Sequence, residues 1–447
     1  MLSERIVATD LAEGILQMSE PKALTVAVIG AGTVGSEVIS LIQLQAEDLA
    51  IRIGAPLEII GVGVKDPTKS RPQIDSNLIT DDIYSLLEKK PDIVIELMGA
   101  IEPTRDYLLQ AINNGSSVIS ANKALLAKDG ATLHQAAEKA DVDIYYEASV
   151  AGAIPLLRPL RESLVGDDVV KILGIVNGTT NYILTKMNDF GESFESALKS
   201  AQDLGYAEAD PTADVMGHDA ASKAAILAQL AFHTRVTVDD VHCEGIVEIT
   251  QQDVKAAQQM GFVIKLLAVA EKVNQDSIVV RVHPAMIPIS HPLASVRDAF
   301  NAVFVQAKAA GSLMFYGQGA GGAPTASAVM GDLVMVGRNR VSNRRGPGES
   351  VYADLNILPI SEAITSYYIN LEVADQPGVL AEISNVFAKH SVSIQTVRQE
   401  TRGKDASLIV KTHQAKESAL EKVIAELKNL SAVKHLNGAM RVEGEEL

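Results

Sequence analysis

The sequence predicts an α/β protein that begins with a doubly wound parallel sheet and continues with an α+β domain and a small βαββαβ domain. The first observation is that short apolar runs alternate with longer amphipathic stretches over residues 24–148, as in a parallel sheet covered by helices on both faces. The second is a glycine-rich turn directly after the first run. The third is that strand and helix patterns recur in a new order after residue 365.

In the first region, five apolar runs predict strands and three amphipathic stretches predict helices. The predicted strands are Leu24–Ile29, Leu57–Val64, Ile93–Leu97, Ser117–Ala121 and Asp143–Ala148. The predicted helices are Gly35–Leu49, Thr104–Asn113 and Gly130–Ala140. Strands that alternate with helices in this way predict a nucleotide-binding sheet.

The middle of the chain predicts a second domain of α+β character. Lys171–Val176 and Ser277–Pro284 have the apolar pattern of strands, and Asp219–Phe232 has that of a strong helix. Residues 338–350 contain four arginines among Asn, Gly and Pro without apolar periodicity, which predicts an exposed linker whose basic side chains are solvated.

The last region predicts a separate βαββαβ module. Its strands are Tyr367–Ala374, Ser393–Thr401, Ala406–Thr412 and Val433–Val442, and its helices are Gly378–His390 and Glu417–Leu427. We therefore expect a 1–21 extension, a dinucleotide domain at 22–148 completed by about 319–336, a substrate domain at 149–318, a linker at 337–365 and a final domain at 366–447.

Composition excludes several classes of protein. A formal net charge of −17 over 447 residues opposes binding to a phosphate backbone, so no nucleic-acid partner is expected. The single cysteine, Cys243, excludes an intrachain disulfide framework and a Cys-rich metal site. No apolar stretch approaches the roughly 18 residues of a membrane span, and the first 20 residues lack a secretory pattern. A cytoplasmic protein without a membrane partner is expected.

The turn after the first strand, Gly30-Ala31-Gly32-Thr33-Val34-Gly35, satisfies G-x-G-x-x-G and opens a helix. This context is the one a Rossmann-type dinucleotide site requires. Gly30 would permit the tight turn, Gly32 the approach of the pyrophosphate and Gly35 close helix packing. The alternative is a glycine-rich turn in an unrelated α/β fold.

The choice of cofactor depends on the end of the second strand, where Lys65 and Asp66 stand. A basic side chain there accepts a 2′-phosphate and an acidic one binds a ribose 2′-hydroxyl. Because Lys65 comes first and Lys69 and Arg71 follow, the sequence favours NADP(H), with NAD(H) also open. Alternatively, Lys65 and Asp66 are only turn residues before Pro67.

Polar residues gather in two places that suit chemistry. Lys123 follows the fourth strand, where a doubly wound sheet presents groups to its ligand, although a surface lysine fits that position equally well. Asp219 and Lys223 are four residues apart on the predicted helix, so their side chains share one face. One interpretation is a surface ion pair. The other is that Lys223, beside the carboxylate, donates the proton in a carbonyl reduction, while Glu208 and Asp219 hold a substrate ammonium group.

Seven motifs, in order, resemble homoserine dehydrogenase. They are Gly30–Gly35, Ala121-Asn122-Lys123, Tyr146–Gly152, Asn177-Gly178-Thr179-Thr180-Asn181, Gly205–Pro211, Gly217-His218-Asp219 with Lys223, and Gly319–Thr325. The resemblance implies NAD(P)-dependent interconversion of aspartate 4-semialdehyde and L-homoserine, on the path to threonine, isoleucine and methionine. It also implies a homodimer or homotetramer.

The resemblance assigns roles to individual residues. Lys223 would donate the proton to the aldehyde oxygen, with Lys123 near both substrate and cofactor. Substrate binding would fall to Glu208, Asp219 and Asp214. The cofactor would contact Gly30, Gly32, Thr33, Val34, Gly35, Lys65, Lys123, Gly205 and Gly319. A monovalent cation, Na⁺, would be held by the Glu147 carboxylate and the carbonyls of Val150, Gly152 and Ile154, which is a donor set that suits a hard cation.

The tail resembles an ACT domain at Ala374-Asp375-Gln376-Pro377-Gly378-Val379-Leu380. Such a resemblance implies an amino-acid effector, and threonine feedback is our hypothesis; a purely dimerising domain is the alternative. Two other functions remain open. An acylating semialdehyde dehydrogenase would need Cys243 as its nucleophile, and a non-catalytic dinucleotide sensor would bind the cofactor without turnover.

Overall fold

The structure, a computed structural model, describes residues 22–402 and 405–445. The expected extension at residues 1–21 lies outside that part of the chain. The described chain divides into two compact units: residues 22–122, 132–146 and 326–348 form the first, and residues 123–131, 147–325, 349–402 and 405–445 form the second. Each unit is described by itself.

The first unit is a six-stranded parallel sheet in the order β3-β2-β1-β4-β5-β6. This is the strand order of a dinucleotide-binding Rossmann fold. Strands β4 and β5 are buried along their length and β1 is buried over its last four residues, as expected of a sheet with helices on both faces. The strands are β1 (Leu24–Ile29), β2 (Leu57–Gly63), β3 (Ile79–Thr80), β4 (Ile93–Glu96), β5 (Ser117–Ser120) and β6 (Ile144–Tyr145).

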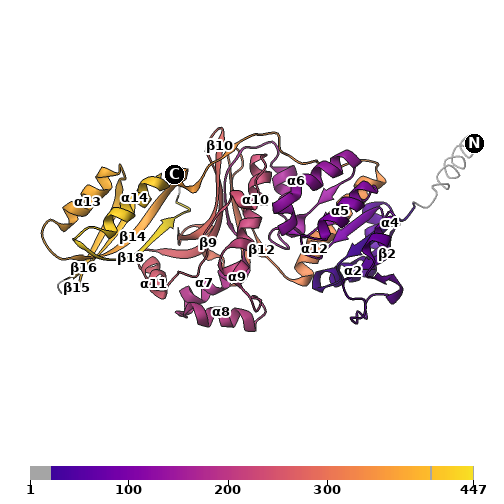
Figure 1. Cartoon of the computed structure of the whole chain (residues 1–447), viewed down its shortest axis with the longest axis horizontal. Helices are drawn as coiled ribbons and strands as arrows, with labels where there is room; N and C mark the ends of the chain where they lie inside the picture. The colour runs from indigo at the N-terminus through magenta and orange to yellow at the C-terminus, as the bar shows by residue number, and fades with distance from the viewer. Residues whose placement is uncertain (1–21, 403–404, 446–447) are drawn as a thin grey trace, which may run out of the picture. The chain divides into compact units, whose positions relative to one another are not determined.

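Most helices of this unit connect successive strands of its sheet (Figure 1). They are α2 (Thr33–Leu44), α3 (Ala46–Ile53), α4 (Ile83–Glu88) and α5 (Thr104–Asn113), with part of α6 (Lys123–Ala140). Most of α12 (Gly322–Val341), which follows β12 much later in the chain, also belongs to this unit. The predicted Gly35–Leu49 helix is instead two helices that meet at Gln45, which has a non-helical φ of −110°. Two short elements, β3 and α4, were not predicted.

The prediction of an exposed linker is wrong for residues 338–341, because α12 continues to Val341. Its basic side chains are held by the first unit rather than by solvent alone. Arg338 donates to the Arg52 carbonyl, and Arg340 donates to the Gly115 carbonyl and pairs with Asp92. These contacts join residues far apart in sequence, so local pattern could not reveal them.

The second unit is built on a mixed sheet in the order β12-β11-β7-β9-β10-β18-β14-β16-β15. The first five strands of this order, two short strands that pair with β10 and the accompanying helices form the α+β part. The five are β7 (Val169–Ile175), β9 (Phe262–Asn274), β10 (Ser277–Pro288), β11 (Phe300–Ala307) and β12 (Gly311–Gln318), and the two short strands are β8 (His242–Cys243) and β13 (Asn356–Ile357). The helices are α7 (Gly178–Phe190), α8 (Phe194–Asp203), α9 (Thr212–Val215), α10 (His218–Phe232) and α11 (Gln251–Gln259).

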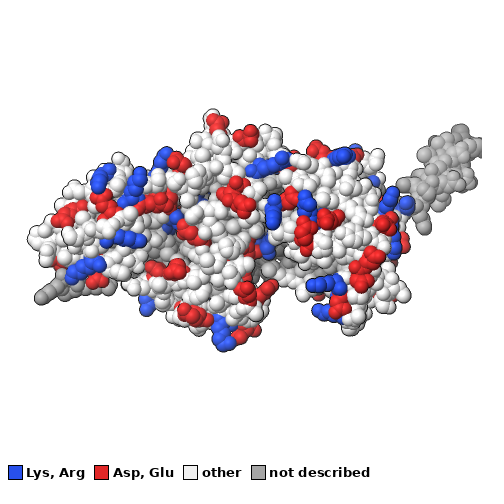
Figure 2. Space-filling view, viewed as in Figure 1, with Lys and Arg blue, Asp and Glu red and all other residues white. Residues whose placement is uncertain are grey.

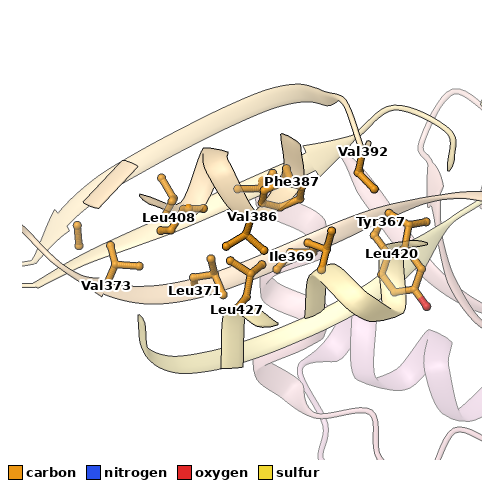
Figure 3. Packing of buried hydrophobic residues seen from close by; sticks show 14 residues of the cluster. Tyr367, Ile369, Leu371, Val373, Val386, Phe387, Val392, Leu408, Leu420 and Leu427 are labelled. Carbon is orange, nitrogen blue, oxygen red and sulfur yellow. The ribbon is translucent and has the colours of Figure 1, made fainter. Parts of the chain in front are cut away.

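The rest of this sheet belongs to the βαββαβ module, whose element order is confirmed. It comprises β14 (Ile364–Ala374), α13 (Val379–Lys389), β15 (Ile394–Arg402), β16 (Asp405–Thr412), a short β17 (Ala415–Lys416), α14 (Glu417–Lys428) and β18 (Val433–Val442). Helices α13 and α14 bury one apolar cluster against the strands, and Figure 3 shows Phe387 and Leu427 of the helices beside Ile369 and Leu371 of β14. Strand β18 also pairs with β10, so the module continues the larger sheet.

On the face shown in Figure 2, acidic and basic side chains are interspersed over the surface. No helix in the described ranges is long and apolar enough to cross a membrane.

Candidate active site

Polar side chains of the second unit meet at the start of helix α10. Asp219 is the second residue of that helix, and its two carboxylate oxygens contact different lysines. Oδ1 lies 2.7 Å from Lys123 Nζ, and Oδ2 lies 2.7 Å from Lys223 Nζ. The contact expected from the four-residue spacing of Asp219 and Lys223 is therefore present, and Lys123 joins it from a distant part of the chain.

The two lysines differ in their surroundings. The Lys223 side chain is 10% exposed and also donates to the Val176 carbonyl at 2.6 Å, whereas the Lys123 side chain is 42% exposed. Burial lowers the pKa of the Lys223 amine, although the charge of Asp219 opposes the shift. A lysine with a lowered pKa releases its proton more readily than one in water, which suits an acid-base role.

Asn177 connects the two partly buried carboxylates of the cluster. It precedes helix α7, and its Oδ1 accepts a hydrogen bond from the Thr180 backbone N–H at 2.8 Å, as a helix N-cap does. Its Nδ2 donates to Asp214 Oδ1 at 2.7 Å and to Asp219 Oδ2 at 2.9 Å. The sequence contained the motif around Asn177 but gave no reason to assign this residue. The N-cap preference of asparagine was the available signal.

The two aspartates have pKa values shifted in opposite directions. Burial alone would raise the pKa of Asp219, but the charges of Lys223 and Lys123 outweigh it and lower that pKa. Burial raises the pKa of Asp214, and the charge of Asp219 adds to this rise, while the Asn177 amide opposes it. Two carboxylates whose environments push their pKa values apart are typical of a site that handles protons.

The expected substrate residue Glu208 is not brought into this cluster. It lies on an exposed loop, and no ion pair joins its carboxylate to any residue in the described ranges. The loop is fastened to helix α7, because Thr179 Oγ1 donates to the Tyr206 carbonyl at 2.6 Å and the rings of Tyr182 and Tyr206 lie 5.1 Å apart. Gly205 is also exposed, and its φ of +77° favours glycine.

The glycine turn of the first unit has the geometry of a phosphate cradle. Gly30 has a φ of +101°, and a Cβ on Gly35 would lie 2.0 Å from the Gly30 carbonyl oxygen. A Cβ on Gly32 would meet nothing within 4 Å, so the turn is open at this position. Helix α2 starts with Thr33 and Val34 and has no side-chain cap. Its first amides thus suit the pyrophosphate of a dinucleotide.

Lys65 and Asp66, the two residues after β2 that bear on the choice of cofactor, have different surroundings. Lys65 is exposed, whereas Asp66 Oδ1 accepts hydrogen bonds from the Thr68 backbone N–H and hydroxyl at 2.9 and 2.6 Å. Arg71 Nε donates to the Ala31 carbonyl of the glycine turn at 3.3 Å. The acidic side chain is therefore occupied in a local turn, and a guanidinium lies against the cradle.

The expected cation residues form one compact turn. Glu147 is buried, and its carboxylate accepts the backbone N–H groups of Leu156, Leu157 and Arg158 at 2.5, 2.8 and 2.9 Å. Ala151 and Gly152 both have positive φ, and Val150 and Ile154 are buried on either side. No group of three or more His, Cys, Asp or Glu that suits a metal occurs in the described ranges, so carbonyl oxygens would have to supply most of such a site.

Gly319 lies against this turn, since a Cβ on Gly152 would be 2.6 Å from the Gly319 carbonyl. Beside Gly319 is the side chain of Asn301, which is 1% exposed. Within the described structure, neither its Oδ1 nor its Nδ2 has a hydrogen-bond partner. A buried amide of this kind normally bonds to protein, water or an ion, so this turn has polar groups that suit an additional partner.

Cys243, the nucleophile that acylating chemistry would need, is not activated. Burial raises the pKa of its thiol, and the charge of Glu244 adds to the rise. Its Sγ lies 3.3 Å from the Met216 carbonyl oxygen, so in space it is close to the turn before α10, although it is distant from the polar motifs in sequence.

The chain contains a Rossmann-type unit with an open glycine cradle and a second unit in which a buried lysine contacts a carboxylate. Together these features define an NAD(P)-dependent oxidoreductase. Family models for the homoserine dehydrogenase NAD-binding domain, for homoserine dehydrogenase and for the ACT domain match residues 30–147, 155–334 and 367–432.

Individual proteins agree with these matches. The homoserine dehydrogenase of Corynebacterium glutamicum is 53% identical over 426 residues, covering 94% of this chain and 96% of the relative. The crystal structure of a homoserine dehydrogenase from Thiobacillus denitrificans is 38% identical, with a TM-score of 0.89 over 94% of this chain and 98% of that one. A hyperthermophilic archaeal homoserine dehydrogenase mutant in complex with NADPH is 25% identical, with a TM-score of 0.60 over 70% and 98%.

The chain belongs to the homoserine dehydrogenase family and carries a C-terminal ACT domain. It is an oxidoreductase that acts on a CH–OH group, which favours neither the acylating enzyme nor the non-catalytic sensor.

Proposed function

We propose that this enzyme interconverts L-homoserine and L-aspartate 4-semialdehyde with Lys223 as its acid and base, and that it serves threonine, isoleucine and methionine formation. The observation that carries the proposal is the buried Lys223 ammonium held between Asp219 and the Val176 carbonyl. The bound nicotinamide would supply or accept the hydride. In the reductive direction Lys223 gives its proton to the developing alkoxide, and in the oxidative direction its neutral amine takes the hydroxyl proton.

Asp219 and Asn177 support this step by position. Asp219 holds both lysines within 2.7 Å, so it fixes the Lys223 amine and keeps the positive charge of Lys123 at the same place. That charge stabilises an alkoxide through space. Asp214, with its raised pKa, and Glu208 on the adjacent loop are proposed to bind the amino-acid end of the substrate.

The proposed cofactor is NADP(H), with NAD(H) as a second choice. Gly30, Gly32, Thr33, Val34 and Gly35 would bind the pyrophosphate, and the exposed Lys65 would bind the 2′-phosphate. The engagement of Asp66 by Thr68 supports this choice, as does the archaeal relative in complex with NADPH. Gly205, Gly319 and Lys123 are proposed as further cofactor contacts.

A monovalent cation, Na⁺, is proposed at the Glu147 turn, with carbonyls of Val150, Gly152 and Ile154. The unpartnered buried amide of Asn301 beside Gly319 supports an additional polar partner in this region. The cation would fix the turn that contacts Gly319.

The ACT domain is proposed to bind threonine at the junction of β14 and α13. Gly378 has a φ of +97° there, and a Cβ on it would meet nothing within 4 Å, so the backbone is open to a small ligand. Calorimetric titration of the full chain with threonine tests this. No binding in a stable oligomer would favour the dimerising alternative.

We also propose a cytoplasmic homodimer or homotetramer. Strands β12 and β15 end the larger sheet on its two sides, and such edges accept another strand. Light scattering coupled to size exclusion gives the mass, and a monomer at all concentrations would contradict this proposal.

The catalytic role is tested by NADPH absorbance with aspartate 4-semialdehyde. Lys223→Met is expected to lower kcat by about 10²–10⁴. The matched control is Lys199→Met, because Lys199 has the same four-residue pairing with an aspartate but lies exposed on α8. A wild-type enzyme that oxidises neither NADPH nor NADH would refute the reaction, whereas full activity of Lys223→Met would refute only the role of Lys223.

A further inference from the structure

The ACT domain contacts the rest of the second unit through Arg441, near the end of β18. Its Nε and Nη2 lie 2.9 and 2.7 Å from Glu417 Oε1 at the start of α14. Its Nη1 donates at 2.7 Å to Oε2 of Glu244, which lies outside the ACT domain. Glu417 also accepts hydrogen bonds from the hydroxyls of Tyr367 and Thr365 on β14. Arg441 therefore connects the core of the ACT domain with one external carboxylate.

Glu244 is fixed by more than this ion pair. Its Oε1 lies 2.7 Å from His242 Nε2, and its backbone N–H donates to the Val282 carbonyl of β10 at 2.8 Å. The Glu244 side chain is 39% exposed, so it is these contacts rather than burial that hold its carboxylate in place. Glu244 itself lies in segment 243–246, so its ion pair with Arg441 links the ACT domain to this segment.

Segment 243–246 packs tightly on the turn formed by residues 215–217. The Ile246 backbone N–H donates to the Val215 carbonyl at 2.8 Å, and Cys243 Sγ lies 3.3 Å from the Met216 carbonyl. A Cβ on Gly245 would lie 2.2 Å from the Val215 carbonyl, and one on Gly217 would lie 3.0 Å from Cys243 Sγ. No space remains between the two backbones, so a shift of one segment must move the other.

The 215–217 turn is the covalent connection between the two aspartates of the candidate active site. Asp214 precedes it, and Asp219 follows it on the first turn of α10. Their carboxylates are spaced by the Asn177 amide, and Asp219 holds Lys223. A displacement at Glu244 is therefore passed to Lys223 through a continuous series of close contacts.

We propose that Glu244 is a positioning residue for Asp214 and Asp219, and that its contact with Arg441 transmits the state of the ACT domain to them. The regulatory half of this proposal rests on the proposed threonine feedback. Its physical content is a coupling free energy between two distant sites, carried by one chain of side-chain and backbone contacts.

The experiment uses the full chain and the variants Glu244→Gln, Arg441→Lys and the pair. Glu426→Gln is the matched control, because it removes an ACT carboxylate that pairs with Lys389 and His390 away from segment 243–246. Each variant is checked by circular dichroism. For Glu244→Gln we expect kcat to fall about tenfold at unchanged KM for the cofactor, because the acid-base groups shift. Threonine should bind as in wild type but inhibit roughly fivefold less.

Each outcome decides something. If the wild type is inhibited and Glu244→Gln is inhibited equally with unchanged kcat, the inference is overturned while feedback stands. If the wild type neither binds threonine nor is inhibited, feedback fails, and kcat alone decides the positioning role: an unchanged value overturns it. In the double-mutant cycle, kcat effects of Glu244→Gln and Arg441→Lys should be non-additive, and strict additivity would overturn the contact as the link.

Discussion

Glu443 is the residue whose replacement should destabilise this protein most clearly. It follows β18 and is 4% exposed, and its carboxylate enters the α+β part of the second unit. Oε1 lies 2.6 Å from Arg281 Nη2, and Oε2 lies 2.9 Å from Lys171 Nζ. Arg281 is fully buried, and its other carboxylate partner is Glu271. Glu443→Gln keeps the size of the side chain but leaves two cations with one carboxylate.

Breaking a buried ion pair by removing one partner costs about 3–5 kcal/mol. Since the amide of the variant still accepts one hydrogen bond, we expect the lower end, about 3 kcal/mol, and a fall of roughly 5 °C or more in the unfolding temperature. Differential scanning fluorimetry measures this. Glu426→Gln, which removes an ion pair on the ACT surface, should leave the unfolding temperature unchanged.

The pH dependence gives a second readout. Burial alone would raise the pKa of Glu443, but the charges of Lys171 and Arg281 outweigh it, so the pKa lies well below 4.5. A carboxylate with a lowered pKa stabilises the fold above its unfolded pKa and loses this contribution as pH falls through the folded value. The difference between wild type and variant should therefore be full at pH 7 and shrink below about pH 4.5. Equal unfolding temperatures at pH 7 would refute the reasoning.

Three further predictions concern single side chains. Burial lowers the pKa of Lys265 to about 7. Between pH 7 and 10.5 this lysine is therefore protonated in the unfolded chain but neutral in the folded one, so the free energy of unfolding should rise with pH. Lys265→Met should abolish this rise in urea unfolding, and the same dependence on pH in wild type and variant would contradict the prediction. Gly32→Ala should fold normally but raise KM for the cofactor about tenfold, whereas Gly35→Ala should unfold at lower temperature, because only its Cβ would meet backbone; the reverse pattern would exclude the cradle. Lys65→Ala should raise KM for NADPH about tenfold and leave that for NADH unchanged, and an equal effect on both would remove the proposed 2′-phosphate contact.

Much of the fold follows from local pattern. The bounds of β1, α5 and β18 agree with the predicted ones, because each apolar or amphipathic run ends at a clear change of composition. Long-range contacts decided the elements that were wrong or missed. Helix α12 extends through Arg338 and Arg340 because distant carbonyls and Asp92 bind these side chains. The two-residue strand β3 has too little pattern to predict.

The candidate site shows the same division. Asp219 and Lys223 share a helix, so helical spacing predicts their contact. Lys123 lies 96 positions before Asp219 in the printed sequence, and only the tertiary structure brings the two within 2.7 Å. Asn177 bridges Asp214 and Asp219, which lie 37 and 42 positions after it in the sequence. The sequence named the chemistry through resemblance, but it could not show which polar groups touch.

The pairing of β10 with β18 affects the order in which the chain can fold as it is synthesised. Glu443 follows Arg281 by 162 positions and follows Lys171 by 272 positions in the sequence. On the ribosome, Glu271 is therefore available to these cations before Glu443, their second carboxylate, has been synthesised. A nascent chain that stops before β18 leaves Lys171 and Arg281 with Glu271 as their one shared carboxylate, which should lower its stability. Variants made to test the proposed threonine feedback should therefore carry substitutions within the ACT domain and keep its last strand.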